Sequence, residues 1–169
     1  MRQRGFTLIE LLVVVMMIGI LTSIAVPQYR KAMDRSKAAE AMQLLPALFE
    51  SRERWMIEHL CTWGGDNEYE CPDGGSLSAN MLDIEVKGVA SGVTYTTSHF
   101  EYNLFAGPGS NGDQQCVSAT PTWGSARLSG TTIYYRGDKF SCKDSTEGSG
   151  GGGCDLLSID ENHGGGGCE

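Results

Sequence analysis

Six cysteines are the side chains in this sequence best suited to covalent chemistry. Their number is even, and none lies in the strongly apolar N-terminal part of the chain. In an extracytoplasmic domain such a set forms disulfides. Zinc binding is the alternative, although the sequence has no Cys-x-x-Cys pair. The disulfide candidates are Cys61, Cys71, Cys116, Cys142, Cys154 and Cys168.

The sequence alone does not choose among the possible pairings of six cysteines. Local pairing of Cys61 with Cys71 is the expectation for one bond, which would close a loop after a long helix. The other four cysteines would form two more bonds. A bond from Cys154 or Cys168 to either of the two earlier cysteines would tie the C-terminal tail to a sheet.

Acidic and amide oxygens in the C-terminal tail are the second candidate group. Calcium prefers such oxygen ligands, but their spacing matches no EF-hand loop. An acidic, solvent-facing loop is the simpler interpretation, so no cofactor is expected and calcium is kept as an alternative. The residues concerned are Asp155, Asp160, Glu161 and Asn162.

Catalytic patterns are missing from the sequence. His59, His99 and His163 stand in three unrelated contexts, and there is no nucleophile elbow or phosphate loop. The chain is therefore not expected to be an enzyme. The Arg-Gly-Asp tripeptide at 136–138 resembles an integrin-binding sequence, but it is also ordinary hairpin-turn chemistry, which is the interpretation adopted.

A carboxylate inside an apolar run is the most unusual feature. Residues 6–26 carry a single charge, Glu10, and would form about 30 Å of helix, enough to cross a bilayer. An ionised side chain at a helix centre in hydrocarbon costs about 2.5–3.5 kcal/mol, so Glu10 needs a partner. A buried helix of a soluble protein or a cleaved secretory signal peptide are alternatives for this segment.

The residues before the run favour a more specific interpretation. The sequence Gly5-Phe6-Thr7-Leu8-Ile9-Glu10-Leu11 follows a short basic stub and precedes the apolar residues. It resembles the processing signature of the type IV pilins and pseudopilins, and Pro27 falls where that family has a helix-kinking proline. The resemblance covers about residues 1–60.

The resemblance implies a life cycle in two stages. A prepilin peptidase would cut between Gly5 and Phe6, and the new amino group of Phe6 would be methylated. The subunit would first be anchored in the inner membrane by residues 6–26, and then pass through an inner-membrane assembly platform into a filament with copies of itself and other pilins. Glu10 would then pair with the Phe6 amine of a neighbour, which fixes the axial register.

Beyond Pro27 the pattern predicts an amphipathic continuation of the helix, to about His59–Thr62. The expected apolar stripe is interrupted at Arg52, which is assigned with the other charged residues to the solvated face. Pro46 is expected to bend the helix. The stripe consists of Ala38, Met42, Leu45, Phe49 and Met56.

Strand signals follow a Gly/Asp/Ser-rich loop at 64–92, in which a short helix or strand is expected near Ala79–Val86. We expect a first strand through 93–104, a second at Cys116–Ala119, and a hairpin of Thr131–Tyr135 with Lys139–Cys142. Three or four antiparallel strands packed on the helix stripe would give an α+β, pilin-like head.

These expectations divide the chain into five parts. They are a leader at 1–5, a membrane-spanning and filament-core helix at 6–26, its amphipathic continuation at 27–62, an α+β head at 63–147, and a Gly-rich, Cys-containing tail at 148–169.

Charge narrows the range of partners without fixing the topology. The formal net charge of −8 argues against nucleic acid as a partner. Four basic residues follow the apolar run, so the positive-inside rule alone would not place the head outside. They are Arg30, Lys31, Arg35 and Lys37.

The expected function is a filament subunit for adhesion, motility or DNA uptake. The alternatives are a pseudopilin of a type II secretion system and a signal-anchored extracytoplasmic binding protein.

Overall fold

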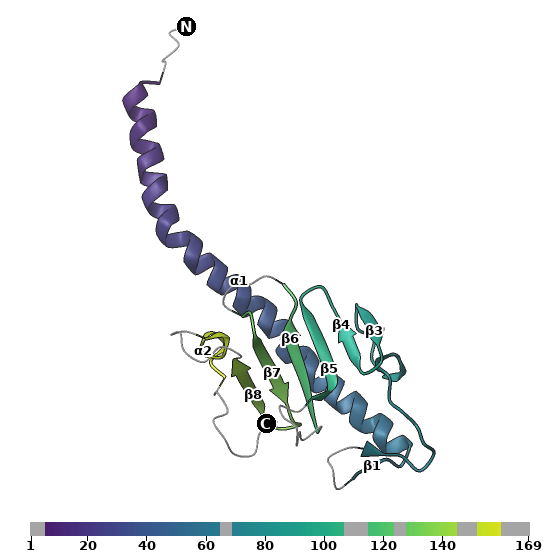
Figure 1. Ribbon diagram of the computed structural model, residues 1–169. Helices are drawn as coiled ribbons and strands as arrows, with labels where there is room; N and C mark the ends of the chain where they lie inside the picture. Colours follow the sequence, from purple (N-terminus) through teal and green to yellow (C-terminus); the bar gives the residue numbers. More distant parts are fainter. Residues whose placement is uncertain (1–5, 65–68, 107–114, 124–127, 145–151, 160–169) are drawn as a thin grey trace.

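The computed structural model describes residues 6–64, 69–106, 115–123, 128–144 and 152–159, and the structural statements below concern these residues. Its largest element is one long helix, α1 (Leu8–Glu58). The C-terminal half of α1 lies along one face of an antiparallel sheet, while the N-terminal half projects away from the rest of the protein (Figure 1). The expected α+β architecture is confirmed.

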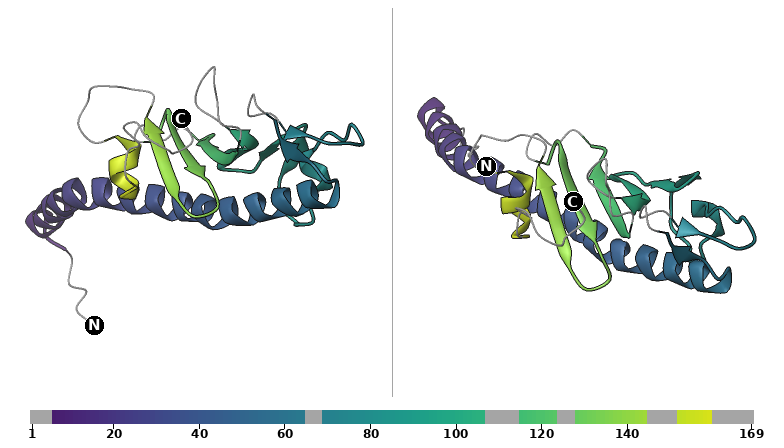
Figure 2. Two further views of the ribbon diagram at one scale, coloured as in Figure 1. Left: turned by 90° about the horizontal axis from the view of Figure 1, so that it is seen from below. Right: turned by 60° about the horizontal axis from the view of Figure 1, so that its bottom comes forward.

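The main sheet is a meander, in which each strand pairs with the next one along the chain in the antiparallel sense. Figure 2 shows the sheet lying on one side of α1. A separate two-stranded sheet precedes it, and a short helix follows it. The bounds are β1 Thr62–Trp63 and β2 Tyr69–Glu70 for the small sheet; β3 Val89–Ser91, β4 Thr94–Thr96, β5 Phe100–Ala106, β6 Cys116–Pro121, β7 Thr131–Tyr135 and β8 Phe140–Asp144 for the main sheet; and α2 Gly153–Leu157.

The predicted hairpin of β7 and β8 is confirmed, with Ile133 opposite Cys142. The prediction of three or four strands is wrong, because the main sheet has six. The stretch expected as one strand through 93–104 folds back on itself as β4 and β5. The hydroxyl of Thr97 makes this turn by accepting hydrogen bonds from the backbone N–H groups of His99 and Phe100, at 3.4 and 3.1 Å. No glycine or proline marks the turn in the sequence.

The loop at 64–92 also contains more structure than expected. It supplies β2, β3 and one 3₁₀ turn at Ala79–Met81, which lies within the range where a short element was expected. The side chain of Asp83 fixes the loop to α1, because Arg54 Nε donates to Asp83 Oδ2 at 2.7 Å and Ser51 Oγ donates to Asp83 Oδ1. These contacts lower the pKa of Asp83 below its ordinary value.

Helix α1 continues through both of its prolines, Pro27 and Pro46. Each proline removes one backbone donor from the helix interior, and the N-terminal half of α1 is visibly curved (Figure 1). The helix ends at Glu58, directly before the expected range of His59–Thr62. Its last turn is closed by Leu60, which has a φ of 54° although it is not glycine.

The core lies between α1 and the inward-facing residues of β5, β6 and β7. The expected stripe is correct at Ala38, Leu45 and Met56, whereas Met42 and Phe49 are only half-buried. The face of α1 that is buried is rotated relative to the predicted stripe. Its residues follow one another at spacings of mostly three and four, and several of them were not in the prediction. The residues that α1 buries are Ala38, Ala41, Leu45, Leu48, Ser51, Arg52, Trp55 and Met56.

Arg52 is the clearest correction, because it was assigned to the solvated face and is 0% exposed. Its guanidinium donates from Nη1 to the carbonyl oxygen of Leu104 at 2.8 Å and from Nη2 to that of Gln115 at 2.7 Å. Glu53 supplies the countercharge at 2.7 Å. The buried guanidinium therefore joins the end of β5 to the start of β6, and no sequence periodicity reports such a role.

Three aromatic rings complete the environment of the Arg52 guanidinium. The carbon Cζ lies 4.6 Å from the ring centroid of Phe49 and 5.6 Å from those of Trp63 and Phe105. Burial lowers the pKa of Arg52, and the contact with Glu53 acts in the opposite direction. The cation is thus retained in the core by hydrogen bonds, one carboxylate and the faces of aromatic rings.

Replacing Arg52 with methionine should destabilise the head by about 3 kcal/mol, because it leaves buried carbonyl groups without their charged donor. Urea unfolding of Arg52→Met, followed by circular dichroism, would measure the loss. The matched control is Arg54→Met, which removes an exposed cation from the same helix and should cost clearly less. Equal losses in the two variants would contradict the role assigned to Arg52.

Candidate functional site

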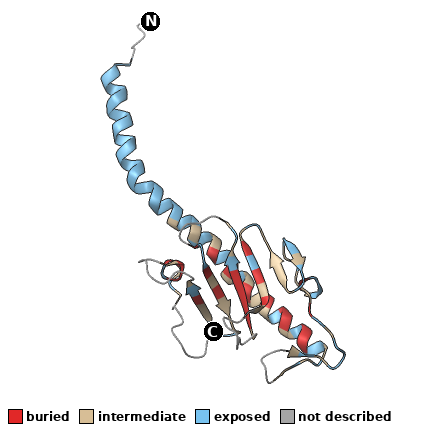
Figure 3. Ribbon diagram, viewed as in Figure 1, coloured by how far each residue is buried: buried red, intermediate tan, exposed pale blue. Residues whose placement is uncertain are grey.

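The N-terminal half of α1 is a large apolar surface that the described part of the head leaves uncovered. Every residue from Phe6 to Tyr29 is exposed, and Phe6 itself is 89% exposed (Figure 3). We call residues 6–26 the apolar segment. Its exposed large side chains are Phe6, Leu8, Ile9, Leu11, Leu12, Val13, Val14, Val15, Met16, Met17, Ile18, Ile20, Leu21, Ile24 and Val26.

Such a surface is stable only when another apolar medium covers it. Among the described residues, α1 is the one helix long and apolar enough to cross a membrane, judged by length and composition. The apolar side chains surround the helix on all sides, so the segment can be enclosed by lipid or by several parallel helices. It is not shaped to dock one face on its own head.

A capping box begins the helix at the outer end of the apolar segment. Thr7 is the N-cap residue, and its hydroxyl accepts a hydrogen bond from the backbone N–H of Glu10 at 3.4 Å. In return, the Glu10 carboxylate accepts from the Thr7 backbone N–H at 2.9 Å and from the Thr7 hydroxyl at 2.7 Å. The box satisfies N–H groups that a helix start otherwise leaves unpaired.

The box also fixes the direction of the Glu10 carboxylate. Both bonds from Thr7 end on the same oxygen, Oε2. The other oxygen, Oε1, accepts no hydrogen bond from any described residue, and Glu10 is exposed. One half of the carboxylate therefore caps its own helix, while the other half is available to a cation from outside.

Thr7 is the residue of this site that sequence reasoning missed. The signal was present, because Thr7-Leu8-Ile9-Glu10 has the capping-box spacing directly before an apolar run. Phe6 precedes the box at the exposed end, and Pro27 follows the apolar segment inside the continuous helix. Gly5, the other expected processing residue, lies outside the described residues.

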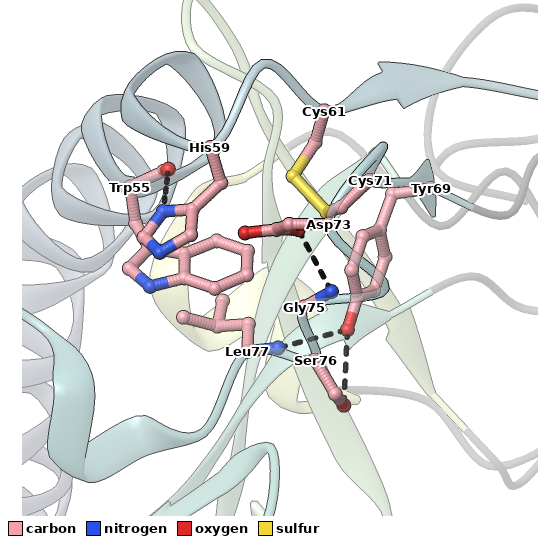
Figure 4. The surroundings of a disulfide bond; sticks show 9 residues. All are labelled: Trp55, His59, Cys61, Tyr69, Cys71, Asp73, Gly75, Ser76 and Leu77. Atoms are coloured by element: carbon pink, nitrogen blue, oxygen red, sulfur yellow. Dashed lines mark hydrogen bonds between the residues drawn. A yellow bond between two sulfur atoms is a disulfide. The ribbon is translucent and has the colours of Figure 1, made fainter.

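One disulfide closes the far end of α1. Cys61 is bonded to Cys71, the pairing expected from the sequence. Figure 4 shows the bond beside the stacked rings of Trp55 and His59, whose centroids are 4.2 Å apart. Tyr69 approaches Trp55 edge-on from β2. The disulfide thus holds the small β1–β2 sheet over the end of the helix.

A second disulfide, Cys142–Cys154, joins β8 to α2. It is one of the tail-to-sheet bonds that the sequence allowed. Arg35 of α1 reinforces it, because Nε donates to the carbonyl oxygen of Leu156 in α2 at 2.9 Å. Cys116 is also disulfide-bonded, and Cys168 lies outside the described residues.

One cluster among the described residues has side chains close enough together to hold a metal ion. Cys142, Asp144 and Cys154 place possible ligand atoms within 4.8 Å of one another. Both sulfur atoms belong to the disulfide, and Asp144 accepts bonds from the Thr131 hydroxyl at 2.5 Å and the Cys154 N–H at 3.2 Å. In its oxidised form this cluster is structural.

Of the calcium candidates, Asp155 is exposed on α2, and Asp160, Glu161 and Asn162 lie outside the described residues.

His59 and His99, the histidines within the described ranges, do not form a common site. His59 stacks on Trp55, whereas His99 contacts Glu40 at 3.2 Å in another part of the head. His163 lies outside the described residues. The Arg-Gly-Asp tripeptide at 136–138 forms the β7–β8 turn, where Gly137 has a φ of 76° and Arg136 donates to Gln115 at 2.8 Å. These contacts support the turn interpretation.

Comparison with known proteins gives one family match and several relatives. Residues 1–26 match the model described as the prokaryotic N-terminal methylation motif. The chain is 31% identical over 158 residues to the type IV major fimbrial protein FimA of Dichelobacter nodosus, covering 84% of this chain and 97% of the relative.

Two further relatives match a smaller share of the chain. The type IV major pilin protein PilA of Myxococcus xanthus is 49% identical over 57 residues, or 34% of this chain and 26% of the relative. A fimbrial protein of Pseudomonas aeruginosa is 45% identical over 56 residues, covering 33% of this chain and 36% of the relative. No solved structure matches the chain significantly.

Removing the second disulfide should release α2 from the head. A helix of five residues is too short to persist alone, so α2 depends on Cys142–Cys154 and on the Arg35 contact. In Cys142→Ser/Cys154→Ser, limited proteolysis followed by mass spectrometry should show cleavage near α2 several times faster than in the wild type. Cys61→Ser/Cys71→Ser is the control, since its loop is of similar length but lies at the other end of the head. Unchanged cleavage near α2 would argue that packing alone holds it.

Proposed function

This chain belongs to the type IV pilin family, and we propose that it is a structural subunit of a type IV pilus-like filament. The relative that it matches along 97% of its length is a type IV major fimbrial protein. The observation that carries the proposal is the fully exposed apolar segment, continuous with the helix that bears the head. A subunit of this form covers its apolar surface by lipid before assembly and by neighbouring subunits afterwards.

The proposal includes processing at the start of the apolar segment. A prepilin peptidase would cut between Gly5 and Phe6 and methylate the new amine. The match of residues 1–26 to a methylation motif supports this step. The exposure of Phe6 and the capping box that starts at Thr7 support it as well, because the helix begins only after the bond to be cut.

In the filament, Glu10 would pair with the positive amine of Phe6 on a neighbour. The orientation of the carboxylate supports this role, since Thr7 binds Oε2 and leaves Oε1 for the incoming amine. In an apolar surrounding, a charge-assisted bond of this kind is strong, and each unpaired charge is costly. The pairing therefore selects one axial position of neighbouring helices and opposes displacement by a turn.

The cellular role of the filament is proposed only as a class of surface functions. Adhesion, motility and DNA uptake all use surface filaments, and the acidic, disulfide-bonded head would form the filament surface. The partners are copies of this chain, other pilins, the peptidase and an inner-membrane assembly platform. The protein acts by polymerising rather than by catalysis. The names of the relatives favour a pilin over a pseudopilin of type II secretion.

The direct test combines mass spectrometry with electron microscopy. Filaments sheared from cells that produce the protein should contain a chain that starts at methylated Phe6. A chain that keeps Met1 and remains in the membrane fraction, with no filament containing it, would count against the proposal and favour a signal-anchored protein.

The role of Glu10 can be separated from its role in the capping box. Glu10→Val removes both functions, whereas Glu10→Gln keeps a side chain that can cap the helix but has no charge. We expect both variants to be processed at Gly5, and both to lose at least tenfold of the assembled subunit in quantitative immunoblots of sheared filaments.

The matched control is Glu58→Val, which removes an exposed carboxylate at the opposite end of the same helix. It should leave the amount of filament unchanged. Wild-type assembly of Glu10→Gln would show that capping, and not charge pairing, is the essential contribution of Glu10.

A further inference from the structure

A short basic band follows the apolar segment and is not explained by the packing of the head. Residues 27–37 contain four cations and a single acid, Asp34. Two of the cations already have a structural role. Arg35 Nε donates to the carbonyl oxygen of Leu156, and Lys37 Nζ lies 4.8 Å from the ring centroid of Trp123.

The other two cations, Arg30 and Lys31, have no such contacts. Neither makes a hydrogen bond or an ion pair with any residue that the structure describes. Arg30 is exposed and Lys31 is partly exposed, whereas the first residue of α1 that the head buries is Ala38. Two long cationic side chains therefore stand on the bare part of the helix, between the apolar segment and the head.

The position of these cations along the helix corresponds to a lipid headgroup layer. At about 1.5 Å per residue, Arg30 lies about 6 Å beyond Val26, the end of the apolar segment. The headgroup layer on each side of the hydrocarbon core is about 5–7 Å thick. When the apolar segment occupies the core, Arg30 and Lys31 are at the depth of the phosphate groups.

Tyr29 supports the same placement. It is 67% exposed and directly precedes Arg30. Tyrosine is enriched at membrane interfaces because its ring is apolar and its hydroxyl is polar. Three successive residues, spaced by about 100° each around the helix, thus present an aromatic ring and two cations to the same layer.

We propose that Arg30 and Lys31 form a binding site for anionic phospholipid headgroups in the leaflet next to the head. The guanidinium and ammonium groups would bind the lipid phosphates, and Tyr29 would lie between the headgroups and the chains. The inference rests on the membrane-anchored stage of the proposed function. It gives the subunit a fixed depth in the bilayer, and assembly must exchange these lipid contacts for others.

Lipid selectivity of the full-length chain in detergent tests the site. The wild-type protein in detergent is mixed with equal amounts of phosphatidylglycerol and phosphatidylcholine, and bound lipids are counted by native mass spectrometry. Each cation near an anionic surface contributes about a fivefold preference, so Arg30→Gln/Lys31→Gln should lose about thirtyfold of the preference for phosphatidylglycerol. Added salt should weaken the preference of the wild type.

Two control variants make the result specific. Lys87→Gln/Lys139→Gln removes two exposed cations from the head and should keep the wild-type preference. Arg30→Lys/Lys31→Arg keeps both charges and should also keep it. Circular dichroism of each variant would verify that the helix and head are folded.

Two outcomes would overturn the inference. The first is equal phosphatidylglycerol preference in the wild type and Arg30→Gln/Lys31→Gln, which contradicts only the headgroup site when the wild-type chain still binds lipid. If the double variant also loses filaments, that result would assign these cations to acidic groups of a neighbouring subunit. The second is failure of the wild-type chain to bind either phospholipid, which would also count against the proposed membrane anchor.

Discussion

The structure depends on an apolar helix surface that the described part of its own head does not cover. The head is built on one face of the C-terminal half of α1, and the apolar segment extends beyond it with side chains exposed on every side. Hydrophobic burial is the dominant favourable term in folding and association, so this segment must always be surrounded by lipid or by other helices. The same requirement explains both stages of the proposed function, because the segment exchanges one apolar environment for another.

In the proposed function, the polar groups near the apolar segment give that exchange its specificity. Apolar packing alone is non-directional and would permit many axial positions. The carboxylate of Glu10, oriented by Thr7, marks one end of the segment. Arg30 and Lys31 mark the other end, beyond Val26. Charged residues therefore stand at both ends of the apolar segment. The apolar side chains between them add buried surface area but do not select an axial position.

Much of this arrangement could be predicted from sequence, since it follows from long and strongly patterned features. The apolar segment, the helix that continues through Pro27, the β7–β8 hairpin and the Cys61–Cys71 bond were all expected. The errors arose where tertiary contacts override a local pattern. Arg52 is buried because Leu104 and Gln115, which lie 52 and 63 residues further along the chain, accept its hydrogen bonds, and no local pattern reports such distant partners. The β4–β5 turn was missed because a threonine hydroxyl replaces the usual glycine.

The meander order of the sheet also determines how the head can fold. Every strand pairs with its sequence neighbour, and the two fully described disulfides join cysteines only 10 and 12 residues apart. Strand pairing and disulfide formation of this kind require little loop closure, whereas the packing of α1 on the sheet joins distant parts of the chain, as the 52-residue separation of Arg52 and Leu104 shows. The sheet can therefore form hairpin by hairpin before it closes on α1, and both of these disulfides can form from cysteines that are already close in sequence.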